Sequence, residues 1–209
     1  FDMVNKRRFA LLQALTRLRQ ICCHPSLVDK TAENEESAKL TATLERIEEL
    51  HAEGHKVLLF SQFVSMLKII RTKLEEMKLP FHWLTGASTD RASIVKAFQD
   101  DENASVFLLS LKAGGSGLNL TAASYVILYD PWWNPAVENQ AIDRAHRIGQ
   151  TQPVIAYRML TRATIEEKIM TLQQKKNLTI SNVLGEGGFT NLLQKEDFEF
   201  LFDIEAARV

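Results

Sequence analysis

The feature that most constrains the fold is the alternation, between residues 56 and 159, of short apolar segments with stretches of helical spacing. This pattern predicts five strands, over 56–60, 81–84, 106–110, 125–129 and 154–159. Three of them contain uninterrupted apolar runs, as expected where both faces of a sheet are covered: Val57–Phe60, Phe107–Leu109 and Val126–Leu128. Strands that alternate with helices form a parallel sheet with helices on both faces. The sequence therefore predicts an α/β fold.

Helices are predicted where apolar residues recur every three or four positions and a capping residue stands at one end. A first helix ends at about Cys23, and a second begins after Ser37 with Gly54 just past its end. The helices between and after the strands cover about 64–77, 91–98, 135–149 and 165–176. Their expected N-terminal caps include Asp90, Asn134 and Thr164.

The chain has 209 residues, of which 45% are hydrophobic and 24% charged, and this composition excludes the disordered and collagen-like classes. No apolar stretch has the length of a membrane span or the pattern of a signal peptide, so no membrane partner is expected. The only two cysteines, Cys22 and Cys23, are adjacent, which suits a reducing compartment. The start without Met suggests a piece of a longer protein.

The formal net charge of −1 hides two basic segments. Residues 140–180 hold seven Lys and Arg against three Asp and Glu, and residues 1–28 hold five against one. A charged helix face is usually only solvated surface, so a nucleic-acid partner must be argued from local features. The acidic segment 29–36 lacks periodicity and is interpreted as a mobile linker.

The most informative segment is residues 140–150, which read Gln-Ala-Ile-Asp-Arg-Ala-His-Arg-Ile-Gly-Gln. On the helix predicted here, two guanidinium groups lie one turn apart, and one face carries Gln140, Asp143, Arg144 and Arg147. Guanidinium stays charged and offers a rigid fork of donors to phosphate oxygens, so the pair suits a polyphosphate. The alternative is an ordinary surface helix with an ion pair between Asp143 and Arg147.

A glycine-rich loop, Ala113–Leu120, follows the predicted strand at 106–110. Gly115 and Gly117 would let backbone N–H groups approach an anion at the carboxyl edge of the sheet. A tight turn is one alternative. Dinucleotide binding is another, with Asp130 as the ribose-binding acid, but Leu120 stands at the third glycine position and the link to the next strand is too short for a crossover helix.

Two further loops carry candidate contacts. Asp130–Pro135 is an aromatic turn whose indole rings either stack on a nucleotide or plug the domain edge, and plugging is favoured. Residues 86–91 place hydroxyl groups at a helix N-terminus, which suits a phosphate or a simple cap. His24 and His146 lack metal partners at useful spacing, so no metal site is expected.

The chain also lacks two elements of a complete nucleotide-hydrolysing site. It contains no Gly-Lys pair, so the phosphate-binding Gly-x-x-x-x-Gly-Lys loop is missing. No strand ends in the Asp-Glu pair that would hold magnesium. A phosphate-facing arginine pair would therefore need another domain to complete the site.

Five motifs, in this order, resemble the Swi/Snf family of ATP-dependent DNA translocases: Leu18–Pro25, Lys56–Phe63, Ala113–Leu120, Trp133–Pro135 and Gln140–Gln150. The resemblance covers nearly all of residues 10–176 and is to the C-terminal helicase lobe, the second of two RecA-like domains. It implies a RecA-like sheet with helical extensions at both ends. The implied segments are a helical segment 1–28, the linker 29–36, the lobe 37–176 and a tail 177–209, whose short acidic end is similar to bacterial members.

The resemblance implies that the N-terminal lobe of the same protein supplies the phosphate loop and holds the Mg²⁺ of ATP. This lobe would present Arg144 and Arg147 to the phosphates as arginine fingers. The other ATP-side residues would be Gln140, which helps position the nucleotide, and three that lie between ATP and DNA, Gly115, Gly117 and Asn119. The isolated chain is expected to be inactive alone.

The resemblance also implies that six residues line the backbone groove of double-stranded DNA: Gln62, Ser88, Arg91, Ser110, Lys112 and Trp133. Contacts to phosphates position DNA without reading its sequence. Two positions depart from the usual family pattern. Leu111 replaces a hydroxyl residue, and Trp132 stands in Asp-Pro-Trp-Trp where Asp-x-Asp-Trp is more usual, so neither is counted as a contact.

These features predict the second motor lobe of an ATP-dependent DNA translocase or remodelling ATPase, with a DNA-bound protein complex as a further partner. A non-catalytic DNA- or protein-binding scaffold is the alternative, and intact Arg144 and Arg147 speak against it. A nicotinamide enzyme is a third hypothesis. The expected location is cytoplasmic and nucleoid-associated in a bacterium, or nuclear in a eukaryote.

Overall fold

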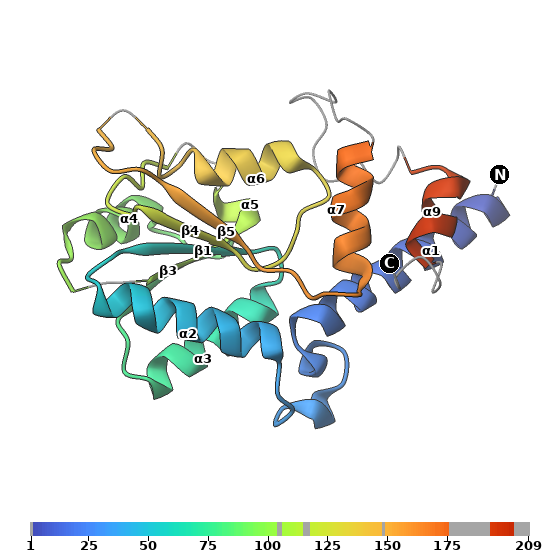
Figure 1. Cartoon of the computed structure of the whole chain (residues 1–209), viewed down its shortest axis with the longest axis horizontal. Helices are drawn as coiled ribbons and strands as arrows, with labels where there is room; N and C mark the ends of the chain where they lie inside the picture. Colours follow the sequence, from blue (N-terminus) through green and yellow to red (C-terminus); the bar gives the residue numbers. More distant parts are fainter. Residues whose placement is uncertain (1, 104–105, 115–117, 148, 176–192, 203–209) are drawn as a thin grey trace.

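The computed structural model of the protein describes residues 2–103, 106–114, 118–147, 149–175 and 193–202. At its centre is a five-stranded parallel sheet in the order β2-β3-β1-β4-β5 (Figure 1). The strands are β1 (Val57–Ser61), β2 (Phe81–Leu84), β3 (Val106–Ser110), β4 (Tyr125–Leu128) and β5 (Ile155–Arg158). Each strand lies within one residue of its predicted bounds, and the parallel α/β fold is confirmed.

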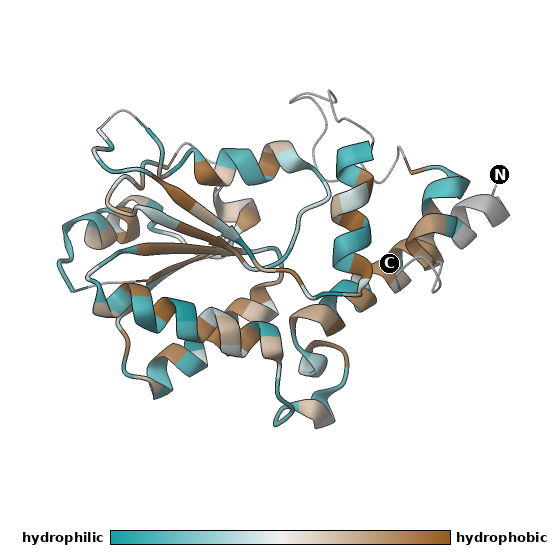
Figure 2. Cartoon of the chain, in the orientation of Figure 1, coloured by the Kyte–Doolittle hydropathy of each residue, from teal (hydrophilic) through white to brown (hydrophobic). Residues whose placement is uncertain are grey.

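The central strand β1 shows why the apolar runs lead to this architecture. All of its residues are buried, and alternate side chains enter two different cores. Leu58 and Phe60 pack on the side of α4 (Arg91–Asp100), α5 (Leu111–Gly114) and α6 (Pro135–Ile142). Val57 and Leu59 pack on the side of α2 (Ala38–Ala52) and α3 (Val64–Glu76). Figure 2 shows apolar strands enclosed between helices that carry many hydrophilic residues.

Three further helices pack together beside the sheet: α1 (Asp2–Cys23), α7 (Ile165–Lys175) and α9 (Lys195–Phe202) (Figure 1). Their shared core includes Leu15 of α1, Ile169 of α7 and Leu201 of α9. Helical extensions are thus present at both ends of the described chain. Residues 176–192 and 203–209 of the predicted tail lie outside the described residues, and the predicted domain bounds stay predictions.

The predicted caps explain where several helices begin. Ser37 Oγ accepts from the N–H of Leu40 at 3.3 Å, and Asp90 Oδ1 accepts from the N–H of Ser93 at 3.1 Å. Asn134 caps α6 in the same way, with Pro135 at the first helical position. These three predicted caps are confirmed.

The start of α7 differs slightly from the predicted capping box. Thr164 Oγ1 accepts from the N–H of Glu166 at 3.2 Å, as a capping hydroxyl does. Glu167, however, accepts from the N–H of Ala163 at 2.8 Å, one residue before the expected donor. Ala163 has a φ of +55°, and this left-handed turn aims its N–H at the carboxylate.

The segment between α1 and α2 contains more regular structure than its sequence pattern indicates. Two short 3-10 helices, η1 (Pro25–Leu27) and η2 (Lys30–Ala32), lie in it. The carboxylate of Asp29 accepts the N–H of Thr31 at 2.9 Å and so caps η2.

Among the described helices, none is both long enough and apolar enough to cross a membrane.

Candidate nucleotide and DNA site

The carboxyl edge of the sheet gathers four loops that the sequence predicts to contact DNA. β1 is followed by Gln62, β2 by the loop that carries Ser88, β3 by α5 with Lys112, and β4 by the turn with Trp133. These strands are parallel and adjacent, so their carboxyl ends meet at one edge, the usual ligand edge of open α/β sheets. The structure therefore brings the loops together, although they are far apart in the sequence.

The polar side chains at this edge differ in exposure. Ser110 is buried, and its hydroxyl accepts from the N–H of Ala113 at 3.3 Å. Ser88 is half-buried, and its hydroxyl accepts from the N–H of Thr85 at 3.1 Å. Arg91, also half-buried, is the first residue of α4. Ser110 and Ser88 thus stabilise their own loops.

Gln62, Trp133 and Lys112 complete the predicted DNA contacts. The Nε2 atom of Gln62 is buried, and a hydrogen bond from the Gln62 side chain opposes the larger effect of burial, which raises the pKa of the Asp130 carboxyl. Trp133 is half-buried, and the guanidinium carbon of Arg19 lies 5.1 Å from its ring centre. For Lys112 the structure describes the backbone in α5 but not the side chain.

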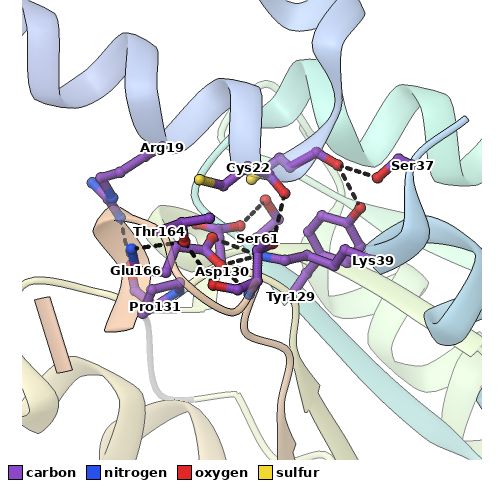
Figure 3. A network of polar contacts seen from close by, with 12 residues as sticks. Arg19, Cys22, Ser37, Lys39, Ser61, Tyr129, Asp130, Pro131, Thr164 and Glu166 are labelled. Carbon is purple, nitrogen blue, oxygen red and sulfur yellow. Dashed lines mark hydrogen bonds and ion pairs between the residues drawn. The ribbon is translucent and has the colours of Figure 1, made fainter. Parts of the chain in front are cut away.

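A buried polar network lies behind this edge (Figure 3). Asp130 is only 1% exposed and accepts hydrogen bonds from the hydroxyl of Ser61 and, at 3.3 Å, from the N–H of Gln62. Burial raises the pKa of the Asp130 carboxyl. This carboxylate joins the ends of β1 and β4 and is covered by protein, which argues against the ribose-binding role that the dinucleotide alternative gave it.

In the arginine segment the structure overturns a prediction. The spacing predicts one helix from Pro135 to about Gly149, but α6 ends at Ile142. After it, the N–H groups of Arg144 and Ala145 bond to carbonyls three residues earlier, at 3.3 and 3.0 Å, as in 3-10 turns. The single helical face predicted for Gln140, Asp143, Arg144 and Arg147 is therefore wrong, since the last three residues lie in the turn that follows α6.

The side chain of Gln150 gives a physical reason for this early end. Its Nε2 atom donates to the carbonyls of Thr121 at 3.0 Å, Ala123 at 2.9 Å and Ala145 at 3.3 Å. These bonds tie the turn to the segment before β4 and offer Ala145 an alternative to the helical ladder. Gly149, with a φ of +106°, reverses the chain so that Gln150 reaches these carbonyls.

Arg144 is buried in this turn, with only 2% of its surface exposed. Its Nε and Nη1 atoms have no hydrogen-bond partner in the part of the chain that the structure describes. Burial, and after it the charge of Arg147, lower the pKa of Arg144. A buried guanidinium with unmet donors is unfavourable unless an anion completes it. The turn is thus suited to bind an anionic group, and the exposed Arg147 adds a second charge.

The last residues of the glycine-rich loop, Asn119 and Leu120, lie next to the same turn. The N–H of Leu120 donates to the carbonyl of Arg144 at 3.0 Å, and Gln99 of α4 donates to the carbonyl of Asn119 at 3.1 Å. Asn119 and Gln140 are both exposed. The structure therefore brings the Asn119 segment to Arg144. Two other predicted residues of this region lie outside the described residues: Gly115 and Gly117.

Metal-binding side chains are not gathered in the described ranges, where no group of three or more His, Cys, Asp or Glu residues could hold an ion. His24 has the structural role that its sequence context favours. Its Nδ1 atom accepts from the N–H of Ser26 at 3.2 Å, so it caps η1. Burial lowers the pKa of this imidazole.

Comparison with known proteins identifies the lobe. Residues 38–149 match the family described as "Helicase conserved C-terminal domain". The chain is also similar to the Sulfolobus solfataricus SWI2/SNF2 ATPase C-terminal domain, with a TM-score of 0.73 and 34% identity, over 95% of this chain and 83% of that one. The chain belongs to the SNF2-type helicase C-terminal domains. The RecA-like architecture that the motifs implied is confirmed.

Relatives of this helicase C-terminal domain occur in bacteria and plants. It is 40% identical over 202 residues to an "Uncharacterized ATP-dependent helicase" of Mycoplasma pneumoniae, a match that covers 95% of this chain and 19% of the relative. It is 44% identical over 151 residues to "DNA repair protein RAD5A" of Arabidopsis thaliana, over 71% of this chain and 15% of the relative. The chain spans less than a quarter of the length of either relative.

A solved complex gives a further comparison for the helicase C-terminal domain. The Sulfolobus solfataricus SWI2/SNF2 ATPase core in complex with dsDNA has a TM-score of 0.76 and 35% identity, over 94% of this chain and 42% of that one. The fold of the present lobe thus matches part of a protein that was solved with duplex DNA.

Two residues of this helicase C-terminal domain escape sequence reasoning although they shape the site. Glu138 is 1% exposed, accepts from the N–H of Trp132 at 2.8 Å and binds Arg158 Nε at 2.8 Å. Its only sequence signal is its position three residues before Ala141 on the inward side of α6. Gln150 gives no signal beyond its place at the end of the arginine motif. Trp132 itself is buried in the core, as the plugging alternative expects.

Proposed function

We propose that this helicase C-terminal domain is the second motor lobe of an ATP-dependent double-stranded DNA translocase or remodelling ATPase. The observation that carries the proposal is Arg144, a buried guanidinium in the same turn as Arg147, two of whose nitrogens have no acceptor among the described residues. The phosphates of ATP would supply those acceptors, with the N-terminal lobe of the same protein on their other side. The relative named as an ATP-dependent helicase supports ATP as the nucleotide.

The ATP-side residues of this lobe would act through position and charge. Arg144 and Arg147 would face the oxygens on which negative charge develops during phosphoryl transfer, as arginine fingers do. Gln140, exposed near the end of α6, would help orient the nucleotide. Mg²⁺ would be held by the N-terminal lobe, so the isolated lobe would not hydrolyse ATP. Between ATP and DNA would lie Gly115, Gly117 and Asn119.

The carboxyl edge of the sheet would hold the DNA backbone. Support comes from the convergence of the four loops there and from the duplex-bound SNF2 relative. Contacts to phosphates would let the motor move along any sequence. The protein would therefore act at the nucleoid or in the nucleus, on DNA and on complexes bound to it. The contacts would be made by Gln62, Ser88, Arg91, Ser110, Lys112 and Trp133.

Replacement of Arg147 by Ala in the full-length protein tests the proposal. DNA-stimulated ATP turnover is expected to fall by about 10³-fold or more, because a positioned finger contributes that much to phosphoryl transfer. The affinity for duplex DNA should change by less than about twofold, because Arg147 lies away from the DNA edge. Arg46→Ala is the matched control, since Arg46 is exposed on α2 and forms an exposed ion pair with Glu49 of the same helix. Unchanged turnover in the Arg147 variant would favour the scaffold alternative.

A further inference from the structure

Three backbone groups of the turn that follows β4 are held by side chains from three different helices. The carbonyl of Pro131 accepts from Arg19 Nη2 of α1 at 2.5 Å. The N–H of Trp132 donates to Glu138 Oε1 of α6 at 2.8 Å, and the carbonyl of Trp132 accepts from Gln173 Nε2 of α7. We call Arg19, Glu138 and Gln173 the clamp residues.

All three clamp residues are removed from water. Their exposed fractions are 2% for Arg19, 1% for Glu138 and 6% for Gln173. A buried polar group is satisfied only by protein partners, so loss of one side chain leaves the opposite backbone group unmet. The turn is therefore fixed from three directions, and it cannot shift without breaking one of these bonds.

The clamp also reaches the ring of the next residue, Trp133. The guanidinium of Arg19 lies 5.1 Å from a ring centre of Trp133 and 5.7 Å from that of Phe63, within cation–π range of both. Arg19 thus holds the turn backbone and the Trp133 side chain at once. Figure 3 shows Arg19 reaching from α1 to Pro131 above the buried network of Asp130.

Two of the clamp residues come from helices that pack beside the sheet, so the stability of the sheet does not explain why they are there. Asn134 already caps α6 locally, and Trp132 already fills the core beneath α6. Arg19 and Gln173, in contrast, belong to α1 and α7, which share a separate core with α9. The clamp residues therefore connect this helical group to the aromatic turn that follows β4 at the carboxyl edge of the sheet.

We infer that Arg19, Glu138 and Gln173 are positioning residues for Trp133. Through them, α1 and α7 raise the affinity of this lobe for DNA without contacting the DNA. The inference rests on the proposed function, because it takes double-stranded DNA as the ligand of the carboxyl edge. The clamp residues hold Trp133 in its binding geometry before DNA binds. The turn therefore does not have to be ordered on binding, and the affinity is not lowered by that entropic cost.

The test is a double-mutant cycle in the full-length protein, with a short duplex of mixed sequence as the probe. Gln173→Met keeps the size of the side chain and removes its donor, and it is expected to weaken duplex affinity by about tenfold, as Trp133→Ala should. The double variant should bind no more weakly than either single variant. Gln174→Met is the matched control, because Gln174 is the exposed neighbour of Gln173 on α7 and should leave affinity unchanged.

Two readouts separate positioning from general destabilisation. The concentration of duplex that half-saturates ATP turnover should rise about tenfold in Gln173→Met, while turnover at saturating duplex stays within about twofold. The salt dependence of binding should keep its slope, because Trp133 is uncharged and no contact between a cationic side chain and a phosphate is lost. Arg19→Lys serves as the second variant: it keeps a charge and a donor, so it should weaken binding less than Arg19→Met does.

Several results would overturn the inference. Independent, additive losses in the double variant would mean that the clamp does not act through Trp133. Wild-type affinity in Gln173→Met, or in Trp133→Ala, would also refute it, while the proposed function would stand as long as the wild-type protein binds the duplex. A wild-type protein that binds no duplex at all would refute both.

Discussion

The N–H of Leu120 donates a hydrogen bond to the main-chain carbonyl of Arg144, with a nitrogen–oxygen distance of 3.0 Å. Gln150, which follows that turn, donates to the carbonyls of Thr121 and Ala123. The end of the glycine-rich loop and the residues after it are therefore bonded to the turn of residues 143–147, which we call the arginine turn, and to Gln150 just beyond it. Since that loop starts at α5 on the DNA edge, a covalent and hydrogen-bonded path connects the proposed DNA groove with Arg144.

Arg144→Met should separate stability from activity. Met occupies a similar volume without a charge, so the free energy of unfolding of this chain is expected to rise by about 1–3 kcal/mol, because the buried unmet donors disappear. ATP turnover of the full-length protein should fall by orders of magnitude. Urea denaturation and an ATPase assay measure the two effects. Arg71→Met, at an exposed residue of α3 that pairs with Glu75, is the control; a loss of stability in Arg144→Met would mean that Arg144 is already satisfied without ligand.

Lys112→Ala should reveal a contact to a DNA phosphate. The affinity of the full-length protein is expected to fall equally for duplexes of different sequence, because phosphates are the same in all of them. The slope of log affinity against log salt should become shallower by about one, since one fewer counterion is released. Titration of two unrelated duplexes at several salt concentrations measures both quantities. A slope equal to that of the wild type would rule out the contact.

The site itself shows what a sequence can and cannot predict here. The strands follow from their uninterrupted apolar runs, and the helix starts follow from local capping residues such as Ser37 and Asn134. Both signals lie within a few neighbouring positions. The early end of α6 does not, because it depends on bonds from Gln150 to carbonyls that precede β4.

The contacts of the clamp residues could not be predicted from the sequence either, because they join residues that are far apart in the chain. Arg19 and Pro131 are separated by 112 positions, and Gln173 and Trp132 by 41. No periodicity links such pairs, so only the folded chain shows that they meet. The motif resemblance singled out Arg144 and Arg147 as candidates to face phosphate, but it did not indicate the burial of Arg144.

Gln150→Glu should disrupt the arginine turn. The substitution keeps the shape of the side chain but directs a charged oxygen, in place of a donor, at the carbonyls of Thr121, Ala123 and Ala145. The free energy of unfolding is expected to fall by about 2–4 kcal/mol, because a charge is introduced at a half-buried position and the carbonyls lose their donor. Gln152→Glu, at an exposed position of the same loop, should cost less than about 0.5 kcal/mol. Equal losses in the two variants would show that the Gln150 bonds are not the cause.

Lys39→Met should break a buried ion pair that joins α2 to α7. Lys39 Nζ lies 2.5 Å from both carboxylate oxygens of Glu166, and the two side chains are 3% and 0% exposed. Removal of the lysine leaves a buried, unpaired carboxylate, so the free energy of unfolding is expected to fall by about 3–5 kcal/mol at a pH of about 8. Lys73→Met, which removes an exposed partner of Glu76, is the control and should cost less than about 1 kcal/mol.

The pH dependence of this loss identifies its cause. Burial raises the pKa of Glu166 above its ordinary value of 4.5, and Lys39 opposes that rise, so the variant should raise this pKa further. A carboxyl whose pKa is higher in the folded than in the unfolded chain binds its proton more readily when folded. Stability therefore falls as the pH rises through the raised pKa and returns as the pH falls. The deficit of Lys39→Met should shrink between a pH of about 8 and about 5, as Glu166 takes up its proton, and urea denaturation across that range measures it. A deficit that stays constant with pH would trace the loss to packing of the lysine stem instead of the unpaired charge.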